Sequence, residues 1–298
     1  MNAIPVLAVA LDRAVGEPPA RMHPVVWMGR YCAWAGARLR RITTRSGQVA
    51  AGAAAVAVGT ASAGAVAVAL QRCAARLPRP IALAAEAAVL STLLSARMLE
   101  GEVARVEAEV GSTGDLAAAR RVVAGLVSRD VSDLDADQIR EAALESLAEN
   151  ASDALVAPLW WYGVAGLPAV AAYRFINTID AMWGYRTPAW EWRGKVAAHA
   201  DDLVNWWPAR LTALLLAPRV GVPRIAHTAR VTPSPNAGWP MAALALLLGV
   251  RLRKPDVYTL HHGGRIARPE DVGRAIRALR RVTAIATVAS ALSTGRRQ

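Results

Sequence analysis

Long apolar runs, interrupted at intervals by short polar stretches, dominate the pattern along this chain. Residues 49–70 contain no charged side chain. A bilayer-crossing helix needs about 20 apolar residues, so this run is long enough to span a membrane. Residues 81–99 form a second candidate span, which Glu86 and Arg97 interrupt. The pattern therefore predicts membrane-crossing helices in the first part of the chain.

Three further apolar segments are shorter, or are broken by proline, glycine or a charge: residues 155–175, 203–217 and 282–292. Such segments are stable in a membrane only when other helices surround them. We therefore expect an all-α fold: a polytopic integral membrane protein with several short or broken helices. The chain is expected to form a single membrane domain over residues 1–298.

Residues 100–153 differ from the rest, because they hold more than half of the chain's 23 acidic residues. This density of carboxylates predicts a solvated helical segment within the domain, on the cytoplasmic side of the membrane.

Composition supports the membrane assignment, since 54% of the residues are hydrophobic and only 19% are charged. The net charge of +12 does not indicate nucleic-acid binding, because the arginines are scattered beside apolar segments and form no single stripe. Four arginines instead precede the first span, namely Arg38, Arg40, Arg41 and Arg45. By the positive-inside rule they place residues 12–48 in the cytoplasm. Neither cysteine has the spacing of a metal site or a disulfide framework.

The first polar stretch lies on a helix predicted from Asp137 onward. Its acidic residues fall at successive i, i+4 positions and share one face: Glu141, Glu145, Glu149 and Asp153. If this face is buried, a cation such as Mg²⁺ or an arginine must compensate the like charges. If it is solvated, no compensation is needed, and the spacing alone slightly favours this second alternative.

Two further polar stretches follow. Tyr173, Asn177 and Asp180 share one helical face, and Asp201-Asp202 is followed by Asn205 and Arg210, with Asp202 and Asn205 on one face. Oxygen ligands of this kind suit Mg²⁺ bound together with substrate phosphates. Arg174 and Arg210 are candidates for binding phosphate or carboxylate oxygens.

Two segments are predicted to be functional loops. Residues 16–30 are rich in proline and glycine and contain His23, although a lone histidine is more often structural than catalytic. Residues 232–240 form a turn-rich stretch in which Ser234 and Asn236 offer hydrogen-bond donors. The sequence contains no P-loop, GxGxxG or HExxH pattern, so any nucleotide must be held in another way.

These stretches, in this order, resemble the CobD/CbiB family of cobalamin biosynthesis over most of the chain. The matching residues are Gly16-Glu17-Pro18, His23-Pro24-Val25, Gly29-Arg30, Glu145, Glu149-Asn150, Asp153, Pro158-Leu159, Tyr173, Asn177-Thr178, Asp180, Met182, Gly184-Tyr185, Asp201-Asp202, Asn205, Pro208-Ala209-Arg210, Ser234-Pro235-Asn236 and Gly238. The chain departs from the family at Glu17, where an aspartate is usual, and at Ala181, where a small hydroxyl residue is frequent. Residues 261–263 match only loosely.

The resemblance implies an adenosylcobinamide-phosphate synthase, a ligase of the bacterial inner membrane with its active site facing the cytoplasm. Such an enzyme joins (R)-1-aminopropan-2-ol or its phosphate to the free propionate of adenosylcobyric acid, using ATP and Mg²⁺. The carboxylate must first be activated, most plausibly as an acyl phosphate, and a base must then deprotonate the incoming ammonium group. Membrane lipid and other enzymes of the cobalamin pathway are the expected partners.

We assign residue roles on the same basis. The catalytic residues are predicted to be Glu149, Asp180 and His23. The metal ligands are predicted to be Asp153, Asp201 and Asp202. The substrate-binding residues are predicted to be Arg30, Asn150, Tyr173, Asn177, Asn205, Arg210, Ser234 and Asn236. The asparagines suit a corrin ring, because that ring is fringed with amides.

A full crossing by residues 155–175 would place Asp180 and Asp201 on the opposite side of the membrane from Glu149. We therefore expect this segment to be re-entrant, or to be broken at Gly163, Gly166 and Pro168. Two other functions are compatible with the membrane helices: a non-catalytic scaffold or AmpE-like sensor, and a transporter. The first does not require the acidic and asparagine-rich stretches, and the absence of inverted repeats weighs against the second.

Overall fold

The computed structural model describes residues 2–112 and 116–295, and 72% of these residues are helical. The chain forms two compact units. The first comprises Met1–Ser95, Pro158–Asn205 and Thr287–Gln298, and the second comprises Ala96–Ala157 and Trp206–Ala286. Each unit is therefore assembled from segments that are distant in sequence.

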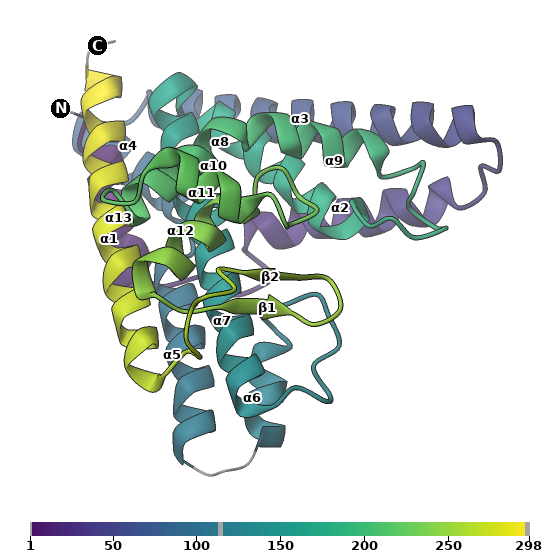
Figure 1. Ribbon diagram of the computed structural model, residues 1–298. Coiled ribbons are helices and arrows are strands. Elements are labelled where there is room, and N and C mark those ends of the chain that lie inside the picture. Colours follow the sequence, from purple (N-terminus) through teal and green to yellow (C-terminus); the bar gives the residue numbers. More distant parts are fainter. Residues whose placement is uncertain (1, 113–115, 296–298) are drawn as a thin grey trace. The chain divides into compact units, whose positions relative to one another are not determined.

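The first unit contains helices from both halves of the chain (Figure 1). They are α1 (Ile4–Val15), α2 (Pro24–Leu39), α3 (Arg45–Ala74), α4 (Arg79–Ser91), α8 (Ala157–Trp183) and α9 (Lys195–Val204). The last helix, α13 (Pro269–Gly295), belongs to the first unit from residue 287 onward.

Three helical stretches are long and apolar enough to cross a membrane: Arg45–Ala74, Arg79–Gly111 and Ala136–Trp183. The spans expected at residues 49–70 and 81–99 lie within the first two, and the third includes residues 155–175. The all-α membrane fold is thus confirmed. Residues 203–217 do not form one helix, because α9 ends at Val204 and α10 begins at Trp206.

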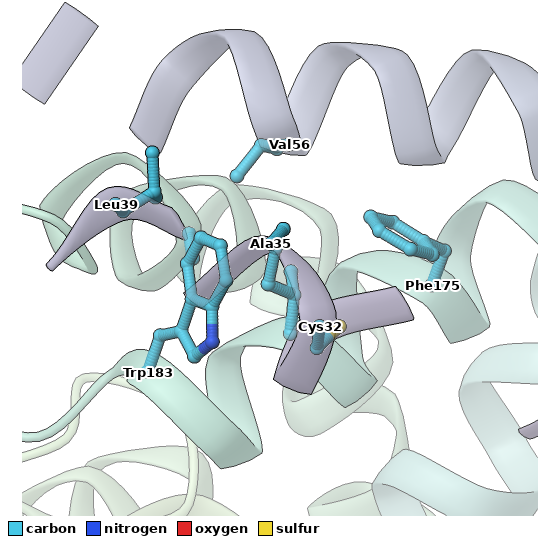
Figure 2. Close-up of a cluster of buried hydrophobic side chains, with 8 residues drawn as sticks. Cys32, Ala35, Leu39, Val56, Phe175 and Trp183 are labelled. Carbon is cyan, nitrogen blue, oxygen red and sulfur yellow. The ribbon is translucent and has the colours of Figure 1, made fainter. Parts of the chain in front are cut away.

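Small residues let α3 approach its neighbours closely. The α-carbon of Gly59 lies so near Phe175 that a methyl group there would overlap the phenyl ring. The same helix passes the carbonyl oxygen of Arg193 at Gly52, where a side chain would also overlap. The apolar cluster formed at these contacts joins α2, α3, α8 and α9 (Figure 2). Its members are Cys32, Ala35, Leu39, Val56, Phe175, Ile179, Trp183 and Ala197.

The break expected in the apolar segment 155–175 is present within α8. Ala165 and Gly166 leave helical geometry, and Gly166 adopts φ 74° and ψ −165°, a conformation that only glycine adopts readily. Pro168 follows inside the helix, where it has no N–H to donate. The sequence therefore encodes the interruption directly.

The second unit is built around α7 (Ala136–Ala151), which is buried along most of its length. Asp135 caps this helix in a reciprocal capping box with Gln138. The π-helical turn η1 (Ser152–Val156) follows it directly. The surrounding helices are α5 (Ala96–Ser112), α6 (Leu116–Val123), α10 (Trp206–Leu216), α11 (Val222–Ala229) and α12 (Gly238–Leu248).

A short antiparallel hairpin packs against α7 and was not expected in an all-α chain. It consists of β1 (Leu252–Lys254) and β2 (Tyr258–Leu260), with Leu252 paired to Leu260. Asp256, in the turn between the strands, has a positive φ of 58°.

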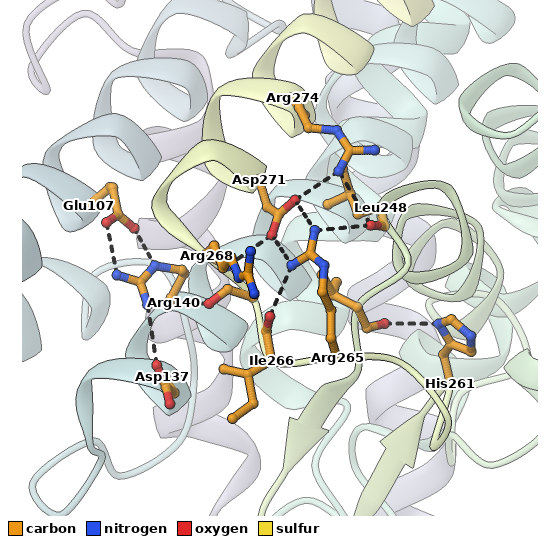
Figure 3. A network of polar contacts seen from close by, with 12 residues as sticks. Glu107, Asp137, Arg140, Leu248, His261, Arg265, Ile266, Arg268, Asp271 and Arg274 are labelled. Carbon is orange, nitrogen blue, oxygen red and sulfur yellow. Dashed lines mark hydrogen bonds and ion pairs between the residues drawn. The ribbon is translucent and has the colours of Figure 1, made fainter.

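Arginine–carboxylate pairs hold the second unit together (Figure 3). Arg140 on α7 donates to both oxygens of Glu107 on α5, at 2.6 and 2.9 Å. Asp271, buried at the start of α13, accepts from Arg265 at 2.6 and 2.8 Å and from Arg274 at 3.0 Å. Arg140 thus links α7 to α5, and Asp271 holds the start of α13 to the loop that precedes it.

Candidate functional site

A buried carboxylate lies at the centre of the polar contacts in the first unit. The side-chain amide of Asn205 donates to both oxygens of Asp201, each at 3.0 Å. The amide of Asn177 on α8 donates to the same carboxylate at 3.3 Å. The Tyr173 hydroxyl in turn donates to the carbonyl oxygen of Asn205 at 2.9 Å. We call these four residues the Asp201 network.

This network brings together three predicted substrate-binding residues and one predicted metal ligand. Asp201 is 9% exposed and Asn205 is 1% exposed. Burial raises the pKa of the Asp201 carboxyl, while the hydrogen bonds from Asn205 and Asn177 act in the opposite direction. The side chain of Asn205 hydrogen-bonds to Asp201, four residues earlier, whereas the sequence spacing had placed Asn205 on the same helical face as Asp202.

The loop before α2 supplies a second group of polar residues in the same unit. The backbone N–H of Val25 donates to Nδ1 of His23 at 3.2 Å, so this histidine caps α2. Its Nε2 lies 3.4 Å from Glu17. A hydrogen bond from His23 is the main reason that the pKa of Glu17 is lowered, and Ser95 and Arg174 act in the same direction. Since Nδ1 is an acceptor, neutral His23 carries its proton on Nε2.

Arg174 connects the loop to the Asp201 network. Its guanidinium donates to the side-chain oxygen (Oδ1) of Asn177 at 3.2 Å, and its charge also acts on Glu17. The side chain is only 8% exposed. The sequence indicated Arg174 as a candidate for binding phosphate or carboxylate oxygens, but it assigned no role to Glu17. The signal for Glu17 was its place in the proline-rich loop, six residues before His23.

The other predicted site residues of the first unit lie at more open positions. Asp180 and Asp202 are half-buried, and Arg30 is exposed on α2. The backbone oxygen of Asp180 accepts from the N–H of Gly184 at 2.6 Å, so that α8 ends in a tight turn.

In the second unit, the acidic face of α7 is not uniformly solvated, so the alternative that the spacing slightly favoured is wrong for its first half. Glu141 is completely buried and pairs with Arg253 at 2.9 Å and with Arg251 at 3.6 Å. Glu145 is 5% exposed and pairs with Arg129 at 2.9 Å. Arginines therefore compensate these two charges, as the buried alternative required.

The remaining acidic positions are more accessible. Glu149 is exposed at the end of α7, and Asp153 is half-buried on η1. Asn150 is half-buried, and its side-chain amide donates to the Ser146 carbonyl at 3.0 Å.

Arg210 organises the loop at residues 232–240. Its guanidinium donates to the Asn236 side chain and, at 2.9 Å, to the Pro235 carbonyl. Trp206 and Trp239 flank the guanidinium, which lies 4.6 and 4.8 Å from their ring centroids.

The Ser234 hydroxyl in the same loop accepts from the N–H groups of Asn236 and Ala237 at 3.2 and 3.1 Å. Three predicted substrate-binding residues thus lie together, with part of the Arg210 side chain engaged by the loop.

The hairpin and neighbouring residues line a cavity of about 490 Å³ in the second unit. Its lining residues are Gln138, Val231, Arg253, Lys254, Pro255, Asp256, Val257, Tyr258, Thr259 and His262. Burial raises the pKa of the Tyr258 phenol well above its ordinary value. This cavity was not predictable from the sequence, because three-residue strands carry too little periodicity to be recognised.

Within residues 2–112 and 116–295, no three His, Cys, Asp or Glu side chains are grouped so that they would hold a metal ion. The predicted ligands Asp201 and Asp202 are consecutive in the first unit, whereas Asp153 belongs to the second.

Comparison with known proteins gives one consistent result. The sequence model of the CobD/Cbib protein family matches residues 5–286. "Cobalamin biosynthesis protein CobD" of Rhodobacter capsulatus is 38% identical, over 95% of this chain and 94% of that protein. "Probable cobalamin biosynthesis protein CobD" of Pyrococcus abyssi is also 38% identical, over 93% of this chain and 91% of that protein. No solved structure matches.

Proposed function

We propose, since the chain belongs to the CobD/CbiB family of cobalamin biosynthesis proteins, that it forms an amide bond on a corrinoid. The acid is the free propionate of adenosylcobyric acid, and the amine is (R)-1-aminopropan-2-ol or its phosphate. Participation in cobalamin biosynthesis implies a corrinoid substrate, which the relatives' names support. The identity of the amine and the use of ATP are part of the proposal.

The Asp201 network is the observation that carries this proposal. The side-chain amides of Asn177 on α8 and Asn205 at the end of α9 donate to one buried carboxylate, and the Tyr173 hydroxyl donates to the side-chain oxygen of Asn205. Burying such groups is unfavourable unless they are fully hydrogen-bonded, and a purely structural contact between two helices would not need them. Asn177 and Asn205 are thereby held in fixed orientations by Asp201, Tyr173 and Arg174, and we propose that this polar cluster lies beside the amide-rich corrinoid.

The proposed reaction has two steps. The propionate first accepts the terminal phosphoryl group of ATP, which forms an acyl phosphate and releases ADP. The amine, having lost a proton to a base, then attacks the acyl carbon; the C–N bond forms, the C–O bond to phosphate breaks and phosphate leaves. Asp180 in the first unit and Glu149 in the second are the proposed bases, since both carboxylates are accessible to solvent.

His23 is better suited to positioning than to proton removal. Its Nδ1 accepts the N–H of Val25, and the proton on Nε2 faces Glu17. We assign it the role of orienting Glu17, whose carboxylate also interacts with Arg174. Arg30 and Arg210 remain the proposed phosphate-binding cations.

The donor chemistry of Asp201 and Asp202 fits Mg²⁺, which proteins usually hold through one or two carboxylates together with substrate phosphates. When bound, the ion would offset phosphate charge during phosphoryl transfer. Asp202 is half-buried and Asp201 is kept in place by two amides. The cytoplasmic orientation of the site in the inner membrane is likewise a proposal.

The proposal is tested with purified protein in nanodiscs, supplied with adenosylcobyric acid, ATP, Mg²⁺ and (R)-1-aminopropan-2-yl phosphate. Mass spectrometry should detect a corrinoid heavier by one amide-linked aminopropanol phosphate, and a parallel reaction with aminopropanol identifies the preferred amine. Retention of corrinoid without product in either reaction would instead support a non-catalytic scaffold. Asp180→Asn and Asp202→Asn should each slow the reaction strongly; a near-normal rate would remove Asp180 as the base in the first variant and Asp202 as a metal ligand in the second.

A further inference from the structure

An exposed surface of arginine, lysine and tryptophan side chains lies where α2 ends and where α3 and α9 begin. All of its residues belong to the first unit. We call it the Trp192 surface and define it by Trp34, Arg38, Arg41, Arg45, Trp192 and Lys195. The proposed amide synthesis makes no use of these residues.

Two cations from different helices lie against the same indole ring. The guanidinium of Arg45, the first residue of α3, lies 5.3 Å from the centroid of Trp192. The ammonium of Lys195, the first residue of α9, lies 4.6 Å from it. On α2, Arg38 lies 3.8 Å from the centroid of Trp34, which is 54% exposed. A cation that packs on an aromatic ring is held at a defined position and keeps its charge, so it can still bind an anion.

The segments that carry these side chains are fixed to one another. The guanidinium of Arg193 donates to the carbonyls of Leu39 and Ile42, at 3.1 and 2.9 Å. The Gln48 side chain donates to the same Ile42 carbonyl at 3.0 Å. Gly52 allows α3 to pass directly over the backbone of Arg193. The surface is therefore a built feature of the fold and not a chance grouping of long side chains.

The charge of the surface is strongly positive. Residues 38–45 contain four arginines and no carboxylate, and each of these arginines is exposed. The nearest acidic residue along the chain from Lys195 is the half-buried Glu191. The natural ligand of such a surface is anionic, and guanidinium groups bind phosphate oxygens particularly well.

The position of the surface on α3 identifies the source of the phosphate. This helix has 30 residues and is therefore about 45 Å long, which exceeds the roughly 30 Å of a bilayer's hydrocarbon core. Only 17% of its most apolar window is buried by the rest of the chain, so the helix presents most of that window outward. Its beginning at Arg45 thus falls in the headgroup layer, where tryptophan and arginine are favoured.

We propose that the Trp192 surface binds the headgroup of an anionic phospholipid. The phosphodiester accepts hydrogen bonds from Arg45 and Lys195, while the acyl chains lie along the exposed apolar face of α3. Arg38 and Arg41 add long-range attraction for the negative headgroup. Trp34 and Trp192 lie at the boundary between the headgroup and the acyl chains.

The chain offers a matched control at the other end of α3. Arg72 and Arg76 are also exposed beside this helix, so replacing both removes the same charge as replacing Arg45 and Lys195. Protein in mild detergent is incubated with equal amounts of phosphatidylglycerol and phosphatidylcholine, and the retained lipids are counted by native mass spectrometry. Wild type should retain phosphatidylglycerol preferentially. Arg45→Gln with Lys195→Gln should lower this preference several-fold, whereas Arg72→Gln with Arg76→Gln should leave it unchanged.

Equal preference in wild type and in the Arg45/Lys195 variant would overturn the proposal, as would an equal loss in the two double variants. Loss of bound ATP or inorganic phosphate in the Arg45/Lys195 variant, with its lipid preference intact, would assign the surface to a soluble anion instead. Thermal unfolding of each variant checks the fold. If the Arg45/Lys195 variant is misfolded, Arg38→Gln with Arg41→Gln should give a smaller loss of preference, because these arginines act at longer range, and an unchanged preference there would contradict the proposal.

Discussion

The pairing of Glu17 with His23 ties the stability of the first unit to pH. The hydrogen bond from His23 lowers the pKa of Glu17 from its ordinary value of 4.5. A carboxyl whose pKa is lowered by folding stabilises the folded state above the unfolded pKa, and this contribution is lost as the pH falls through the folded pKa.

We therefore expect Glu17→Gln to lower the unfolding temperature by a constant amount above about pH 4.5, the ordinary pKa of glutamate. The difference from wild type should shrink as the pH falls further. Thermal unfolding in detergent across this range measures it. A difference that grows toward low pH would show that the ionised carboxylate does not stabilise the fold.

The pair between Glu145 and Arg129 is another interaction of single residues, and both side chains are almost inaccessible, at 6% and 12% exposure. Removing one partner leaves the other charge buried, which typically costs about 3–5 kcal/mol. Arg129→Met should therefore destabilise the protein by about this amount, as judged by equilibrium unfolding in detergent.

Replacing both residues by methionine should restore most of the lost stability, because no unpaired charge then remains. If the double variant is as unstable as the sum of the single ones, the two side chains do not depend on each other, and the burial argument fails.

At the scale of single residues, the sequence predicted which side chains share a helical face but not which partners they have. The i, i+4 spacing placed Glu141 and Glu145 on one face, but it did not reveal that the face is buried. That fact depends on Arg129, Arg251 and Arg253, whose pairing partners are distant in sequence. Likewise, spacing linked Asn205 to Asp202, whereas the folded chain pairs it with Asp201. Periodicity finds shared faces, but the choice of partner is made by tertiary contacts.

At the scale of elements, the contact between α3 and α8 depends on a glycine. A methyl group at Gly59 would overlap Phe175, whereas at Gly64 its nearest neighbour would be the Pro168 carbonyl at 3.8 Å. Gly59→Ala should destabilise the protein by about 1–3 kcal/mol through overpacking. Gly64→Ala should be neutral or should stabilise the helix by up to about 1 kcal/mol.

The two variants carry the same substitution on the same helix, so the comparison isolates packing from helix propensity. Thermal unfolding of both in one detergent is the measurement. Equal effects would mean that α3 does not approach α8 closely.

The break in α8 was predictable because Gly166 and Pro168 are local signals, readable without knowledge of the rest of the fold. The β1–β2 hairpin was not, since its strands have three residues each and its turn places Asp256, not glycine, at positive φ. Elements that are defined by local chemistry can thus be read from sequence, and those stabilised by packing on α7 cannot.

At the scale of the whole molecule, the break in α8 bears on membrane topology. We expect the segment to return to its original side, so that residues after Trp183 face the cytoplasm. Arg186 is exposed just beyond the helix. A cysteine at this position, in a chain whose Cys32 and Cys73 are replaced, should react with an impermeant maleimide added from the cytoplasmic side. Labelling from the periplasmic side alone would show that the segment crosses fully.

The membrane helices, the family and the order of the polar stretches all follow from the sequence, because each rests on composition or on linear motifs. The division into two units does not. Pro158–Asn205 folds with Met1–Ser95, and Trp206–Ala286 folds with Ala96–Ala157. The acidic residues 100–153 lie near two of these boundaries, but nothing local in the sequence shows which distant segments fold together.

The central claim is that the Asp201 network serves the synthesis of an amide on a corrinoid. Asp201→Asn keeps the size of the side chain but replaces one acceptor oxygen with a donor, which faces the amides of Asn177 and Asn205. Asp130→Asn is the control, because Asp130 is exposed and its side chain accepts a local bond from Ser132. Both variants are compared with wild type for amide formation and for thermal unfolding.

We predict that Asp201→Asn lowers the rate of corrinoid amide formation by about 10²-fold or more, while the protein still unfolds cooperatively near the wild-type temperature. Asp130→Asn should retain the wild-type rate. A folded Asp201→Asn protein that forms the amide at a near-normal rate would contradict the account.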